Sequence, residues 1–116
     1  MQIPQELLAL ILPNFIVNHF TFIDGKSSKE HLHLYFEEIN DKSIFESRKV
    51  ESKGFHKEIT IEDFPLRGKL VYLHLKRSRW RDANTKEVLQ RDWTVIAKGT
   101  RMTEEFATFL KGINRY

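Results

Sequence analysis

Apolar and polar residues near the start of the chain alternate with helical spacing. Pro4 stands where a first helical turn tolerates proline. Pro13 has no N–H to donate and clashes with the preceding turn, so a helix must end or kink there. We predict a helix before Pro13 and a short helical turn over residues 14–18. The apolar positions that recur three to four residues apart are Leu8, Ile11, Leu12 and Phe15.

The end of the chain has the same spacing. Thr103 is a residue type that caps helices, and Glu104 and Glu105 follow where the helix dipole favours negative charge. A closing helix is therefore predicted, although Gly112 weakens its last turn. Its apolar positions are Phe106, Phe109, Leu110 and Ile113.

Between the helices, apolar residues alternate with a period of two, which predicts strands. Residues 19–24 and 30–37 read as a hairpin around an Asp-Gly turn at 24–28. In the returning strand Leu32, Leu34 and Phe36 lie on one face, and His31, His33 and Tyr35 on the other. Residues 38–50 are polar and predict a long loop.

The second half of the chain predicts further strands. Residues 50–61 form an extended stretch, and Pro65 and Gly68 indicate a turn over 62–69. Residues 70–80 give the strongest strand pattern, and 88–97 return as its hairpin partner. We expect one α+β domain over residues 1–116: an antiparallel sheet of two hairpins, with an N-terminal and a C-terminal helix packed on it.

Composition restricts the function classes. The 116 residues are 41% hydrophobic and include nine Phe, three Tyr and two Trp, enough for a core. The absence of cysteine excludes disulfides, Cys-based zinc sites and a Cys nucleophile, and fits a reducing, cytoplasmic location. The first 22 residues lack a basic region and a cleavage site, and no stretch has the roughly 18 apolar residues of a membrane span.

Charge is unevenly distributed. Residues 1–66 hold seven Lys or Arg and eleven Asp or Glu, whereas residues 67–101 hold ten and three. The later segment is therefore net +7 in a chain of net +3, which indicates a polyanionic partner.

Most of this charge falls near the tip of the second hairpin. Arginine forks suit phosphate oxygens and base edges, and Trp80 can stack on a base or pack in the protein. The alternative is a solvated tip whose charges keep the strand edge from pairing. Lys98 and Arg101 lead into the last helix, whose first N–H groups can hold a phosphate. The alternative for this segment is a simple loop and helix cap. The candidate DNA-binding residues are Lys76, Arg77, Arg79, Trp80, Arg81, Lys86, Arg91, Lys98 and Arg101.

Other chemistry has little support. His31 and His33 share a strand face without an obvious third metal ligand, so no metal or cofactor is expected. The neighbouring carboxylates Glu62 and Asp63, like Glu37 and Glu38, point to opposite faces of a strand. Each pair therefore offers at most one ligand per face to a nuclease metal.

The run from Glu58 to Trp80, the Arg91-Asp92-Trp93 triplet and the run from Ala97 to Thr103 resemble the N-terminal region of insertion-sequence transposases. The resemblance extends from Leu7 to Leu110. It implies recognition of the element's terminal DNA or help in assembling the transposition complex, with the acidic catalytic triad in another segment. The wider family has a zinc-binding cysteine cluster after the basic strand. Here residues 80–84 carry none, so side-chain packing, such as Trp80 on Trp93, must hold the tip.

Together these patterns predict a non-catalytic DNA-binding accessory region, with DNA as its partner. An alternative is a protein-interaction module that docks on a separately encoded catalytic transposase subunit. A small metal-dependent nuclease is a third hypothesis.

Overall fold

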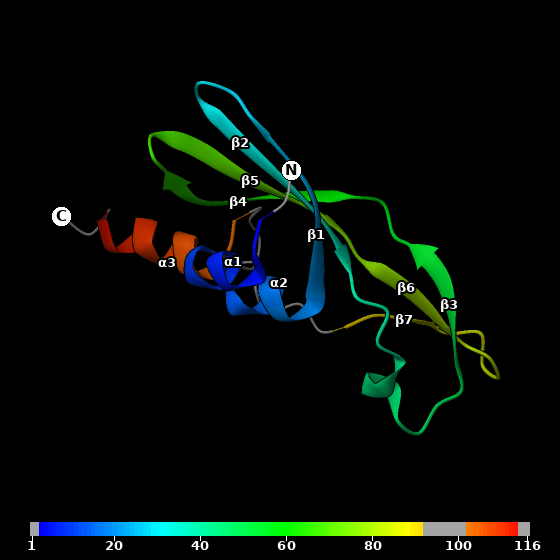
Figure 1. Ribbon diagram of the computed structural model, residues 1–116. Helices are drawn as coiled ribbons and strands as arrows, with labels where there is room; N and C mark the ends of the chain where they lie inside the picture. The colour runs from blue at the N-terminus through cyan, green and yellow to red at the C-terminus, as the bar shows by residue number, and fades with distance from the viewer. Residues whose placement is uncertain (1–2, 92–101, 114–116) are drawn as a thin grey trace.

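The computed structural model describes residues 3–91 and 102–113 (Figure 1). In chain order its elements are α1 (Gln5–Ile11), α2 (Asn14–His19), β1 (Phe20–Ser27), β2 (His31–Glu38), a short 3₁₀ helix η1 (Lys42–Phe45), β3 (Val50–Phe55), β4 (Ile59–Leu66), β5 (Lys69–Lys76), β6 (Ser78–Asp82), β7 (Val88–Leu89) and α3 (Glu104–Ile113). The predicted α+β class is confirmed.

The strands form two sheets rather than one. A four-stranded sheet has the order β1-β2-β5-β4, and a three-stranded sheet has the order β3-β6-β7. All pairs are antiparallel except β2 with β5, which are parallel in the middle of the larger sheet. The smaller sheet extends away from one end of the larger one (Figure 1).

The first two helices pack on one face of the four-stranded sheet. As predicted, α1 ends before Pro13 and a second short helix, α2, follows it. None of the described helices is long and apolar enough to cross a bilayer. The buried residues of the core come from both helices and from all four strands: Leu8, Leu12, Ile16, Phe20, Leu34, Phe36, Ile61, Val71, Leu73 and Leu75.

The predicted β1–β2 hairpin and its alternation are confirmed, but the predicted turn at residues 24–28 is wrong, because β1 continues to Ser27 and Ser27 pairs with Leu32. Leu34 and Phe36 are buried, while His33 and Tyr35 between them are half-buried on the opposite face. The register shifts between Phe22 and Asp24, so β1 contains a bulge at Ile23. Ile23 is consequently 50% exposed.

The predicted turn over residues 62–69 is present but shorter than expected, at Arg67 and Gly68 alone. Strand β4 continues to Leu66, and Leu66 pairs with Lys69 across a two-residue turn. Pro65 is tolerated in the strand because β4 is at the edge of its sheet. The turn residues Arg67 and Gly68 both have positive φ, 55° and 78°, as a tight hairpin turn requires.

The predicted strand 70–80 divides at Arg77 into β5 and β6, which belong to different sheets. Strand β5 pairs with β4 and β2, so residues 70–80 and 88–97 do not form one long hairpin. Only Val88–Leu89 of the expected returning strand pairs, with β6. Residues 92–97 lie outside the described part of the chain.

The closing helix is confirmed, with Thr103 as its cap. The Thr103 hydroxyl accepts from the backbone N–H of Phe106 at 3.3 Å and donates to Asp63 Oδ1 at 2.8 Å. Burial raises the pKa of the Asp63 carboxyl, opposed by the Thr103 hydrogen bond. This contact fixes α3 to β4. The predicted apolar stripe is only partly covered, because Phe109 and Ile113 are 50% and 52% exposed.

We predict that Thr103→Val destabilises the fold by about 2 kcal/mol, because it removes a helix cap and one of the hydrogen-bond donors to the buried Asp63 carboxyl. Urea denaturation measures the change in unfolding free energy. Thr108→Val, at an exposed position of α3, is the matched control and is expected to cost less than about 0.5 kcal/mol. Equal effects of the two substitutions would contradict the assigned role of Thr103.

Candidate nucleic-acid interface

Strand β6 separates buried from accessible side chains by alternation. Ser78, Trp80 and Asp82 are buried, whereas Arg79 is exposed and Arg81 is half-buried. Successive side chains of a strand point to opposite faces. The arginines of β6 therefore share the open face of the three-stranded sheet, and half-buried Arg77 lies at the start of this face.

Trp80 anchors β6 from the other side. Its ring is fully buried, its Nε1 donates to Asn40 Oδ1 at 2.8 Å, and Phe45 meets it edge-on at 5.3 Å. Of the two roles considered for Trp80, the geometry is that of packing, because no ring face is left for a base. Its expected partner Trp93 lies outside the described residues.

Glu38 fixes the junction between the two sheets. Its carboxylate accepts from the backbone N–H of Ser78 at 2.8 Å and from Arg91 Nε at 3.0 Å. The Glu38 and Arg91 side chains are only 1% and 11% exposed. Arg91 is therefore bound in an internal ion pair, and its expected role as a DNA contact stays a prediction.

Strand β3 adds charges that the pattern of the sequence did not reveal. Glu51 lies opposite Arg81 in the register of β3 and β6, and Lys53 Nζ lies 3.1 Å from Glu51 Oε2. The Lys53 hydrogen bond and charge, then Lys86 and Arg81, lower the pKa of the Glu51 carboxyl. Three cations thus surround one carboxylate, and the face remains net positive.

His56 lies beside the arginines at the start of this face. Its backbone N–H donates to the Arg77 carbonyl at 2.8 Å. Burial first, and then the charges of Arg77 and Arg79, lower its pKa. His56 is consequently neutral at neutral pH and does not contribute to the charge of the face.

The remaining candidate residues are dispersed. Lys86 is exposed in the β6–β7 turn with φ 65°. Asp82 supports that turn by accepting from the N–H groups of Asn84 and Thr85 at 2.8 and 2.9 Å. Lys76 lies on the four-stranded sheet beside Glu37, whereas the arginines of β6 belong to the three-stranded sheet. Lys98 and Arg101 lie outside the described residues.

A second cluster occupies the helix-free face of the four-stranded sheet. Tyr35 stacks on His74 with ring centroids 4.4 Å apart and an 11° interplanar angle. His33 Nδ1 and His74 Nε2 share a hydrogen bond of 2.8 Å, and His74 Nδ1 faces Thr60 Oγ1 at 2.9 Å and Glu58 Oε1 at 3.4 Å. This pair bridges the parallel strands β2 and β5. Sequence periodicity placed His33 on this face but gave no sign of its partner.

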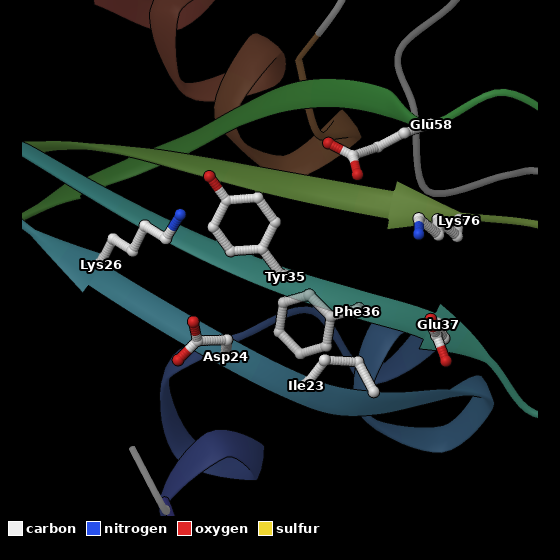
Figure 2. Close-up of a pocket in the computed structure, with 8 residues that line it drawn as sticks. All are labelled: Ile23, Asp24, Lys26, Tyr35, Phe36, Glu37, Glu58 and Lys76. Carbon is white, nitrogen blue, oxygen red and sulfur yellow. The ribbon is translucent and has the colours of Figure 1, made fainter.

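Beside these rings lies a cavity of about 200 Å³ (Figure 2). Three strands and the residues before β4 contribute to its lining. The lining residues are Ile23, Asp24, Lys26, Tyr35, Phe36, Glu37, Glu58 and Lys76.

The carboxylates considered for a nuclease are differently engaged. Asp63 is buried against Thr103 and Glu38 against Arg91, while Glu62 lies half-buried on the other face of β4 from Asp63. Within residues 3–91 and 102–113, no group of three or more His, Asp or Glu is arranged to hold a metal ion.

Comparison with known proteins finds no matching family model, no similar curated protein and no similar solved structure.

We predict that acidification destabilises the fold partly through His74. Burial chiefly lowers its pKa, with His33 and Lys26 adding to the effect and Glu58 opposing it. The unfolded chain then binds the proton more tightly, so stability decreases as the pH falls below about 6.5. Denaturation midpoints measured from pH 7.5 to 5 report this slope. His74→Gln should flatten it and His31→Gln, on the same face, should not; the reverse result would contradict the assignment.

Proposed function

We propose that this chain is a non-catalytic DNA-binding accessory region of a transposase, which recognises the ends of an insertion element. The observation that carries the proposal is the alternation along β6. It gathers Arg77, Arg79 and Arg81 on one face, backed by the buried Trp80. Guanidinium groups on a rigid strand suit phosphate oxygens and base edges.

The charges around β6 extend this surface. Lys53 on β3 and Lys86 in the β6–β7 turn lie at the same sheet, and Glu51 is the acidic residue placed among them. We name the set Lys53, Arg77, Arg79, Arg81 and Lys86 the arginine face. The transposase assignment itself rests on the resemblance of residues 58–80 and 97–103.

An accessory rather than a catalytic role is supported by the carboxylates. Asp63 and Glu38 each hold a structural partner, and the adjacent Glu62 and Glu37 point to the opposite faces of their strands. Two-metal cleavage needs carboxylates that converge from separate elements.

Charge removal on the arginine face tests the proposal. The Arg79→Ala/Arg81→Ala variant should bind terminal-repeat DNA more weakly, and its log–log salt slope should fall by about 0.9 for each phosphate that the protein no longer neutralises. Fluorescence anisotropy across a salt series measures both quantities. A scrambled duplex beside the repeat separates sequence recognition from nonspecific attraction.

The matched control is Lys29→Ala/Lys111→Ala, which removes two charges from exposed positions in the β1–β2 turn and on α3. It should leave the slope nearly unchanged. If the arginine variant folds and binds the repeat as tightly as the parent chain, DNA binding does not use this face. Failure of the parent chain to bind DNA at low salt would instead favour the docking role.

That second candidate, docking on a separate catalytic subunit, is favoured by exposed apolar side chains near α3. The ring centroids of Phe64 and Phe109 are 5.4 Å apart, and the two residues are 38% and 50% exposed. Ile11 and Leu66 line a small cavity beside Phe64, and Leu10 on α1 is 82% exposed. Co-purification with the protein of the adjacent reading frame tests this role, and Phe109→Ser should reduce the yield of the complex.

A further inference from the structure

The cavity on the helix-free face has the features of a site for one flat ring. Tyr35 is one of the residues that line the cavity (Figure 2). His74 stacks against the Tyr35 ring at 4.4 Å, and the flexible Lys26 side chain, whose Nζ lies over the same ring, must move aside for a second ring to stack there. The histidine is itself held by His33 and Thr60. The Tyr35 ring is therefore fixed in place before any ligand arrives, which lowers the entropic cost of stacking on it.

The walls of the cavity supply both acceptors and donors. Asp24, Glu37 and Glu58 offer carboxylate oxygens, while Lys26 and Lys76 offer ammonium groups at its two ends (Figure 2). Lys26 Nζ lies 5.4 Å from the centre of the Tyr35 ring. The β1 bulge places Ile23 and Asp24 together in the lining, because it adds one residue opposite β2.

The size of the cavity and the charges that line it restrict the class of ligand that it can take. At about 200 Å³, the cavity is smaller than the roughly 300–1,000 Å³ typical of sites for drug-sized molecules. A phosphate inside it would face three carboxylates against two lysines. A neutral planar ring with amino hydrogens would stack on Tyr35 and donate to the carboxylates instead.

We propose that this cavity takes a single unpaired nucleobase that bears an exocyclic amino group, such as adenine or cytosine, in preference to thymine, which has none. The proposal rests on the proposed function for the kind of ligand, and it places a second contact on a different sheet from the arginine face. Strand β5 carries Lys76 at the cavity and leads directly into β6. Lys76 and Arg79 are three positions apart along the chain, about 10 Å of strand. Duplex bound at the arginines would thus lie near enough to deliver a frayed or overhanging base.

The test uses labelled hairpin DNA that is blunt or that ends in three unpaired adenines, cytosines, thymines or abasic sites. Anisotropy with the full chain should show at least about five-fold tighter binding to the adenine or cytosine ends than to thymine or abasic ends. Tyr35→Leu should abolish this preference, Tyr35→Phe should keep it, and Tyr72→Leu, a tyrosine of the same face outside the cavity, should keep it.

A second variant protects the test against misfolding of Tyr35→Leu. Glu37→Gln/Glu58→Gln keeps the ring and should reduce the preference for amine-bearing bases over thymine. Equal binding of all four ends by the parent chain, or a preference that survives both variants, would overturn the proposal.

The two proposals fail in different ways. Arg79→Ala/Arg81→Ala should weaken binding to every hairpin but leave the preference among the ends. If the blunt hairpin does not bind, duplex binding is refuted. The proposed base site is then tested by itself, from the NMR shifts of the Tyr35 ring when single-stranded dA, dC and dT pentamers are added. Larger shifts with dA and dC support it, and equal or absent shifts overturn it.

Discussion

The arrangement of the two sheets depends on one buried carboxylate. Glu38 ends β2, receives the first backbone N–H of β6, and binds Arg91 beyond β7. A buried charge is costly unless it is paired and hydrogen-bonded, and here both oxygens are engaged. This contact helps to fix the angle between β5 and β6 at Arg77, together with the hydrogen bond from the His56 N–H to the Arg77 carbonyl. The position of the arginine face relative to the core therefore depends on a hydrogen bond to the backbone of Ser78, which lies between Arg77 and Arg79.

The two candidate surfaces are rigid for different reasons. The arginine face is backed by Trp80, which is buried under η1 and bonded to Asn40, so its charges project from a strand that is fixed from behind. The Tyr35 ring beside the cavity is held from the side. His74 stacks against it, and His74 is itself held by its hydrogen bond with His33. The first arrangement suits an extended polyanion, and the second suits a flat group of limited size.

Local patterns predicted the elements better than their partners. The three helices and the first hairpin follow from periodicity, Pro13 and the Thr103 cap. The division at Arg77 also had a signal in the sequence, since the apolar positions change from odd (Leu73, Leu75) to even (Trp80). The distribution of charge along the sequence indicated that residues 67–101 are basic. It could not show that Arg91 pairs with Glu38, because that partner is 53 residues away. Pro65 misled because a turn and an edge strand tolerate proline equally.

The parallel pairing of β2 and β5 also determines when the larger sheet can form during synthesis of the chain. His31 meets Leu70, 39 residues later, and β3 and β4 both lie on the connection between them. Such distant pairing slows folding, because the chain loses the entropy of closing a long loop before the strand-pairing interactions can form. At about 5–20 residues per second, a ribosome needs about 2–8 s to deliver β5 after β2. Throughout that interval the first hairpin exposes an unpaired inner edge, and nascent chains are open to mispairing with one another.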